Sequence, residues 1–213
     1  MSSDQSLKMR REVSELLASV GITEDFFWSL GDESDWSLVI KMHALFEAVV
    51  GRLVVGRLNK PGLEDVVSNL EFNNMKSGKV AFARALGLLE SEDVAFLRGL
   101  SELRNRLVHD IRNVNFSIAD DISNKNASEL KKFRKEFGWT ITQLKNGEEE
   151  YERLLKSTPK WIVFLAGYVC LLRLQFRVSD HDRNRIVDAL VKASHHGGIL
   201  MPGANTAEKG KAS

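Results

Sequence analysis

The stretch LSELRNRLVHDIRN, residues 100–113, gathers the side chains of this chain that are best suited to chemistry on a phosphate. Arg104, Asn105 and His109 stand in it among leucines at helical spacing. An arginine binds phosphate oxygens as a planar, charged donor, and a histidine transfers protons near neutral pH. The simplest alternative is a solvated helix face, on which the helix dipole favours a histidine near the C-terminal end.

The spacing decides which of these side chains can meet. Asn105 and His109 are four residues apart, so they share one face of a helix. Arg104 and His109 are five residues apart, which separates them by about 140° around the helix axis. We therefore expect a second helix, or a second subunit, to close any site that uses both.

The segment RNRLVH, residues 104–109, resembles the signature of the HEPN superfamily, in which an arginine and a polar residue precede a histidine by a few positions. KMHALFEAVVGRLV, residues 41–54, is similar to the early long helix of these proteins, and the apolar segment 161–178 fits their last helix. The resemblance implies an all-α, HEPN-like bundle of four or more helices, here with extra short helices. It also implies a homodimer whose two motifs line one cleft.

Many HEPN proteins are metal-independent endoribonucleases of toxin–antitoxin, abortive-infection and CRISPR-linked systems. The resemblance therefore implies a toxin-like or antiviral effector with an RNA substrate, no cofactor and no metal, in which the RNA 2′-hydroxyl attacks the adjacent phosphate. It gives His109 the role of general acid, Arg104 that of stabilising the phosphate charge, and Asn105 that of orienting either group. Arg106 and Arg112 are candidates for contacts to the RNA backbone.

The segment LRNRLVHD, residues 103–110, is also similar to mannitol operon repressor-like helical domains, whose members are not established nucleases. This second resemblance implies a non-catalytic module that binds and regulates a protein partner. A nuclease needs Arg104 and His109 together in a cleft, whereas a regulator needs neither. For a toxin the protein partner would be an antitoxin.

Other polar residues have simpler interpretations. His43 and Glu47 are four residues apart on an apolar segment, which favours a structural hydrogen bond over a catalytic role. KKFRK, residues 131–135, is typical of a solvated face, with extension of an RNA track as the alternative. The acidic run at residues 148–150 would repel phosphate, so we expect it to lie away from the site.

The composition limits the possible classes of protein. The chain has 30 Lys and Arg against 29 Asp and Glu, so a nucleic acid would have to meet a local basic patch. The single cysteine, Cys170, lies in an apolar run, which predicts a buried, inert thiol and excludes a disulfide framework. The N-terminal residues have no apolar core typical of a secretory signal. The most apolar run, residues 161–172, is shorter than a membrane span, so we expect no membrane association and a cytoplasmic location.

Helical periodicity dominates the sequence. Apolar residues at three- and four-residue spacings predict helices near residues 4–20 and 35–59, a motif helix at 92–110 and a last core helix at 159–178. Asp35 and Ser91 are the expected N-caps. The last helix is apolar nearly all round, which predicts a central place in the bundle or in a dimer interface.

The remaining segments have weaker patterns. Residues 113–128 are rich in Asn, Asp and Ser and predict a loop, and residues 139–144 alternate as in a strand. We expect one helical domain over residues 1–190 and a disordered tail at 196–213.

Overall fold

The computed structural model describes residues 11, 14–60, 62–74 and 76–195, and for residues 178–195 it describes the backbone alone. The chain has two compact units, residues 1–177 and 178–213. The domain predicted over residues 1–190 extends past this division, and the tail predicted at 196–213 lies outside the described residues.

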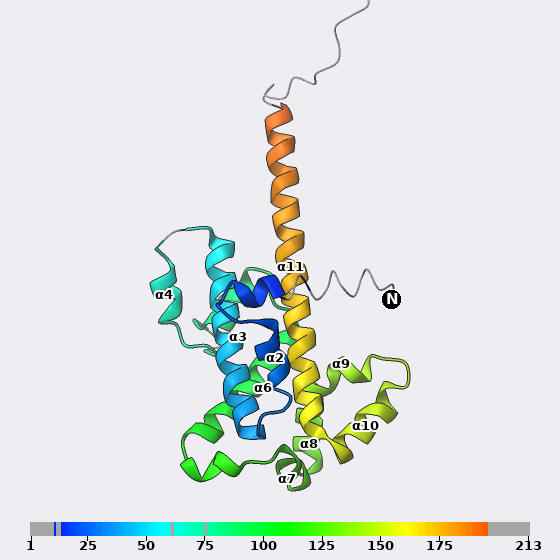
Figure 1. The fold of residues 1–213 in the computed structure, drawn as a ribbon. Coiled ribbons are helices and arrows are strands. Elements are labelled where there is room, and N and C mark those ends of the chain that lie inside the picture. Colours follow the sequence, from blue (N-terminus) through cyan, green and yellow to red (C-terminus); the bar gives the residue numbers. More distant parts are fainter. Residues whose placement is uncertain (1–10, 12–13, 61, 75, 196–213) are drawn as a thin grey trace, which may run out of the picture. The chain divides into compact units, whose positions relative to one another are not determined.

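All elements of the described residues are helices, which confirms the all-α class (Figure 1). The α-helices are α2 (Glu24–Ser29), α3 (Asp35–Leu58), α4 (Glu64–Ser68), α5 (Lys79–Ala85), α6 (Ser91–Val108), α7 (Ile118–Ser123), α8 (Ala127–Phe133), α9 (Trp139–Thr142), α10 (Gly147–Ser157) and α11 (Pro159–His195). A 3₁₀-helix, η1 (Ile111–Asn115), follows α6, and a π-helix, η2 (Arg134–Gly138), joins α8 to α9. Residues 14–18 are also helical.

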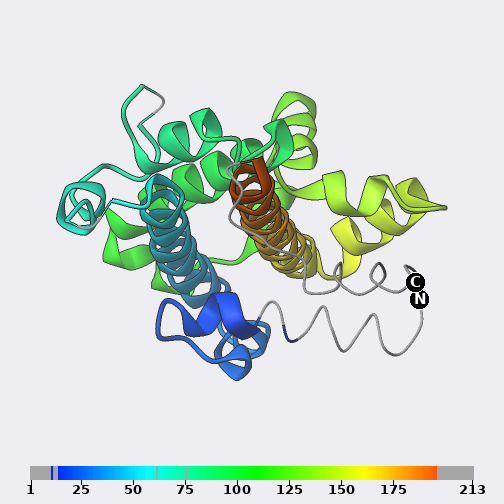
Figure 2. The same cartoon turned by 90° about the horizontal axis from the view of Figure 1, so that it is seen from above.

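Three long helices, α3, α6 and α11, form the centre of the first unit. Seen from above, α2 lies on one side of α3 and α6 on the other (Figure 2). Two glycines allow close approach between elements, because a Cβ on Gly167 of α11 would lie 2.8 Å from the sulfur of Met42 on α3. A Cβ on Gly99 of α6 would lie 2.9 Å from the side chain of Glu136 on η2.

A row of buried phenylalanines connects the central helices to the π-helix. The rings of Phe46 on α3 and Phe96 on α6 lie 5.1 Å apart, and Phe96 and Phe137 lie 5.9 Å apart. Phe133 and Phe137 follow at 4.9 Å. Edge-to-face and tilted contacts of this kind add to the burial of the rings, so this row fixes α6 between α3 and η2.

Helix α11 supplies much of the core, as its apolar sequence predicts. Its buried side chains include Ile162, Val163, Phe164, Ala166, Cys170, Leu171 and Leu174. By length and composition the stretch Pro159–Arg177 could cross a membrane, and half of it is buried inside the protein. The buried core helix of a soluble protein passes the same test, so this one stretch is weak evidence for a membrane span.

The loop predicted at residues 113–128 is wrong, because η1, α7 and the start of α8 occupy it. The Asn and Ser residues of this segment cap short helices. The hydroxyl of Ser117 accepts a hydrogen bond from the N–H of Asp120, and Asn126 forms a reciprocal capping box with Glu129. Residues with the composition of a loop thus begin two helices.

Three local predictions also need correction. Residues 139–142 form α9 rather than a strand, since Trp139 and Ile141 are buried in helical geometry. Ser34, not Asp35, caps α3, and its hydroxyl accepts from the N–H of Ser37. At the start of α6 the N-cap is Glu90, one residue before Ser91. In a capping box, its side chain accepts from the backbone N–H of Asp93, and the Asp93 side chain accepts from the backbone N–H of Glu90.

Candidate functional site

The motif residues lie at the C-terminal end of α6. Leu100, Leu103 and Leu107 are buried and hold this end against the bundle. Arg104 is half-buried, whereas Asn105 and His109 are exposed, and His109 is the C-cap of the helix. The apolar stripe therefore anchors α6 and leaves the polar residues of the motif at the surface.

Arg104 and His109 do not converge within one chain. The guanidinium of Arg104 donates a hydrogen bond of 3.1 Å to the side-chain oxygen of Asn105, its neighbour in the sequence. His109 makes no hydrogen bond or ion pair to any described residue. Arg104 and His109 are five positions apart at the end of α6, and this spacing turns the two side chains in different directions.

Arg106 and Arg112, the candidates for RNA contacts, are already engaged. The guanidinium of Arg106 lies 2.9 Å from a carboxylate oxygen of Asp121 and 5.8 Å from the ring centre of Phe116. Arg112 binds Asp110 through two nitrogens, with a closest distance of 2.6 Å. This contact lowers the pKa of Asp110. Both arginines would have to release a carboxylate before binding a phosphate, so they are weaker candidates than Arg104.

A buried polar group lies beside Arg104, on the facing side of α3. His43 is 7% exposed, and its ring lies edge-on to Phe72 at 5.0 Å. Burial lowers the pKa of His43 to about 4; the charge of Glu47 opposes this shift, and that of Arg104 adds to it. His43 is therefore neutral at pH 7, with the charge of Arg104 close by.

Glu47 binds a lysine rather than His43. The ammonium of Lys79, at the start of α5, lies 2.8 Å from a carboxylate oxygen of Glu47, and the Lys79 side chain is 6% exposed. No hydrogen bond joins His43 to Glu47 in the described part of the chain. The predicted hydrogen bond between His43 and Glu47 is therefore wrong. Glu47 instead forms an ion pair with Lys79, 32 residues further along the sequence.

Sequence analysis missed Lys79, although one signal was present. A lysine that directly follows Gly78 at the start of a helix meets the positive end of the helix dipole, where a cation is unfavourable. Such a lysine is stabilised by an acidic partner from another element. The partner, Glu47, could not be chosen without the tertiary structure.

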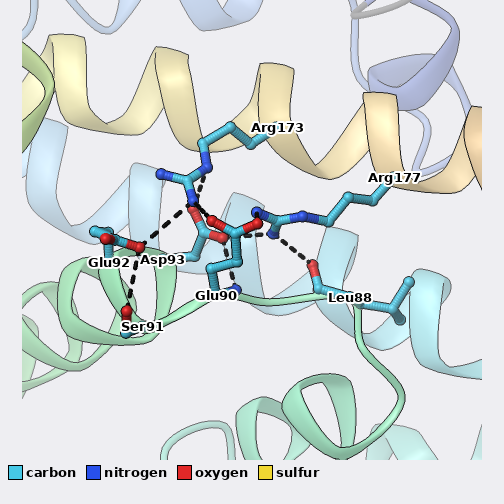
Figure 3. Close-up of polar contacts among 7 residues, drawn as sticks. All are labelled: Leu88, Glu90, Ser91, Glu92, Asp93, Arg173 and Arg177. Atoms are coloured by element: carbon cyan, nitrogen blue, oxygen red, sulfur yellow. Dashed lines mark hydrogen bonds and ion pairs between the residues drawn. The ribbon is translucent and has the colours of Figure 1, made fainter.

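The N-terminal end of α6 carries a second cluster of charges, which connects it to α11 (Figure 3). Asp93 is fully buried, and its carboxylate lies 2.5 Å from a nitrogen of Arg177 and 3.2 Å from one of Arg173. Both arginines also contact Glu90, and Arg177 donates to the carbonyl oxygen of Leu88 at 3.0 Å. Every charge in this cluster has an opposite partner, so the cluster fixes the position of α6.

Cys170 is fully buried, as predicted, and burial raises the pKa of its thiol well above the ordinary value. Within the described residues no group of three or more His, Cys, Asp or Glu side chains is placed to hold a metal ion.

Comparisons with protein-family models, with curated proteins and with solved structures find no match for this chain.

Proposed function

We propose that this protein is a metal-independent endoribonuclease of HEPN type, a toxin-like or antiviral effector that acts in the cytoplasm. One observation carries the proposal. In the motif, Arg106 and Arg112 have carboxylate partners, whereas Arg104 and His109 have none among the described residues. A charged donor and a proton-transfer group without a carboxylate partner among the described residues are suited to binding a phosphate.

The proposed enzyme is a homodimer. Arg104 and His109 face different sides of one helix, so a second copy can bring its own Arg104 to the His109 of the first. Three apolar side chains next to the motif support such a contact, since Val108, Ile111 and Val114 are 38%, 80% and 46% exposed. Exposed apolar residues that follow one another at the end of a helix favour a surface that binds another protein.

The reaction follows from these groups. The 2′-hydroxyl of the RNA attacks the adjacent phosphorus, the bond to the 5′-oxygen breaks, and His109 gives that oxygen a proton. Arg104 binds the non-bridging oxygens and stabilises the charge that develops on them. The products carry a 2′,3′-cyclic phosphate and a 5′-hydroxyl. Since these residues supply both the proton and the charge, cleavage should persist in EDTA.

The first test removes each group in turn. His109→Ala should lower the cleavage rate of a labelled RNA by about 10²–10⁴-fold, the usual contribution of a general acid, without lowering the melting temperature. Arg104→Ala should act similarly, and Arg104→Lys should restore only part of the rate because lysine lacks the bidentate fork. Arg98→Ala is the matched control, since Arg98 is an exposed arginine of the same helix that binds Glu102.

A mixing experiment tests the two-chain site. The Arg104→Ala and His109→Ala proteins are each inactive, but a mixed dimer holds one intact pair if Arg104 and His109 come from different copies. Refolding the two together in equal amounts should then recover about a quarter of the parent rate, because half of the dimers are mixed and each has one working site of two. No recovery would place both groups of a site in one chain.

The exposed apolar residues beside His109 also favour a second candidate, a regulatory module that binds a protein partner at this end of α6. The same experiments separate the two. A pure dimer that leaves a mixed RNA pool intact, with and without added metal, would support the regulatory module, in which Arg104 and His109 form part of the partner's binding surface.

A further inference from the structure

A pocket of about 380 Å³ lies between α3, α4 and α5, on residues that the proposed reaction does not use. Helix α4 lies beside α3 (Figure 1), and Lys79 begins α5. The wall of the pocket is mainly apolar, with Ala48 and Gly51 from α3 and Val67 from α4. A concave, mainly apolar pocket of this size that also holds a few polar groups is typical of a site for a small molecule.

Gly51 keeps this pocket open at a cost to the stability of α3. It lies inside a helix of 24 residues, where a glycine is about 1 kcal/mol less favourable than an alanine. A Cβ at this position would lie 3.9 Å from Cδ of Lys79 and 4.0 Å from Cγ1 of Val67, which are ordinary van der Waals contacts. The packing of the described chain therefore does not require a glycine here, and the missing side chain adds to the space of the pocket.

The ammonium of Lys79 is the polar centre of the pocket. Lys79 is 5% exposed, and its ammonium donates to one carboxylate oxygen of Glu47 at 2.8 Å. An ammonium has three N–H donors, and the described residues offer no acceptor to the other two. Buried donors are normally satisfied, so an oxygen of a ligand in the pocket would complete the hydrogen bonds of Lys79.

Glu47 supplies an acceptor next to this donor. Its contact with Lys79 uses Oε1, its side chain is 39% exposed, and its second oxygen has no hydrogen bond within the described structure. The other charged residues of the wall are one arginine and one glutamate, Arg52 and Glu64. The pocket as a whole thus carries no net charge, which favours a neutral ligand that both accepts and donates a hydrogen bond.

We propose that this pocket binds a small, neutral molecule that carries an amide group on an apolar body. The amide oxygen accepts from Lys79, the amide N–H donates to the free oxygen of Glu47, and the apolar body lies against Gly51 and Val67. A hydrocarbon without the amide leaves the donors of Lys79 unsatisfied, and a carboxylate meets the like charge of Glu47. The inference does not depend on RNA cleavage, since the described wall of the pocket contains no residue of the motif.

The test uses ε-caprolactam, a cyclic amide with an otherwise aliphatic ring, as the probe. Its affinity is measured by NMR titration of protein labelled with ¹³C at the alanine and valine methyl groups. N-Methylcaprolactam keeps the carbonyl and loses the N–H, and hexanoate replaces the amide by a carboxylate. Gly51→Leu fills the pocket from α3. Gly56→Leu is the matched control, because it adds the same side chain to the same helix where a Cβ has no neighbour within 4 Å.

The shifts caused by ε-caprolactam should be centred on the methyl groups of Ala44, Ala48 and Val67, which line the pocket. N-Methylcaprolactam and hexanoate should bind about tenfold more weakly, because each loses the hydrogen bond to Glu47. Gly51→Leu should bind ε-caprolactam at least about tenfold more weakly, and Gly56→Leu should bind it like the parent. Neither change should lower the melting temperature, since leucine forms helices better than glycine.

Four results would overturn the inference: no saturable binding of ε-caprolactam by the parent, equal or tighter binding of either comparison compound, shifts centred on other methyl groups, or a folded Gly51→Leu protein that binds like the parent. If Gly51→Leu does not fold, the three compounds compared on the parent protein decide the outcome. Because no RNA is present, failure of the nuclease proposal leaves this result unaffected.

Discussion

The two ends of α6 both carry charged side chains, but only at the N-terminal end does every one of them have an opposite partner. At the N-terminal end Glu90 and Asp93 contact Arg173 and Arg177 of α11. At the C-terminal end His109 has no partner among the described residues. Buried charges persist in proteins when they are paired, so the first end is built for stability, whereas the second end carries the proposed site.

Mutations at the two ends of α6, only a few turns apart, should therefore have different effects. A change at the N-terminal end should be seen in the free energy of unfolding. A change at His109 should be seen in RNA cleavage. The three predictions below test this division from the largest expected effect to the smallest.

Asp93→Ala should have the largest effect on stability. It removes the buried carboxylate that both Arg173 and Arg177 contact, and it removes the capping-box hydrogen bond that the Asp93 side chain accepts at the start of α6. Breaking a buried ion pair from one side costs about 3–5 kcal/mol, so the midpoint of urea unfolding should fall sharply. Glu92→Ala is the control, because Glu92 lies on the same turn, is partly exposed and contacts Arg173 at a longer 3.5 Å. Loss of cleavage in Asp93→Ala with an unchanged unfolding midpoint would show that the N-terminal end of α6 serves the reaction and not stability.

His43 should make the protein less stable in mild acid. Its pKa is lowered from 6.5 to about 4, so between these values the unfolded chain takes up a proton that the folded protein does not. The free energy of unfolding therefore keeps the full contribution of neutral His43 above about pH 6.5. It falls by about 3 kcal/mol as the pH drops toward 4. The free energy of unfolding of His43→Gln should depend less steeply on pH over this range. Parallel pH profiles for the two proteins would show that His43 is not held neutral by the fold.

Glu47→Ala should have the smallest of the three effects. It leaves the buried ammonium of Lys79 without its carboxylate, and Glu47 is itself partly exposed, so we expect a loss of about 1–3 kcal/mol. Adding Lys79→Met should recover most of this loss, because the second change removes the unpaired charge. The readout is thermal unfolding of both variants alongside RNA cleavage. Loss of cleavage in Glu47→Ala with an unchanged melting temperature would instead make the Glu47–Lys79 pair part of the site.

Local pattern in the sequence determined the all-α class and the place of the motif. The stripe of leucines on residues 91–108 predicts the helix, and the spacing of Arg104 and His109 predicts that they face different sides of it. These features depend on residues within a few turns of one another. The same local rules failed at residues 113–128 and 139–144, where caps and buried side chains decided in favour of helices.

Contacts between distant segments were decided only by the tertiary structure. Lys79 meets Glu47 across 32 residues, and Arg177 meets Asp93 across 84. The π-helix η2 lies beside α6 because the rings of Phe133 and Phe137 pack toward Phe96. No periodicity records such pairs, since a charged residue has the same local pattern whether it meets water, a carboxylate or a phosphate. Which of these it meets depends on the packing of α3, α6, η2 and α11, and that packing is a property of the whole core.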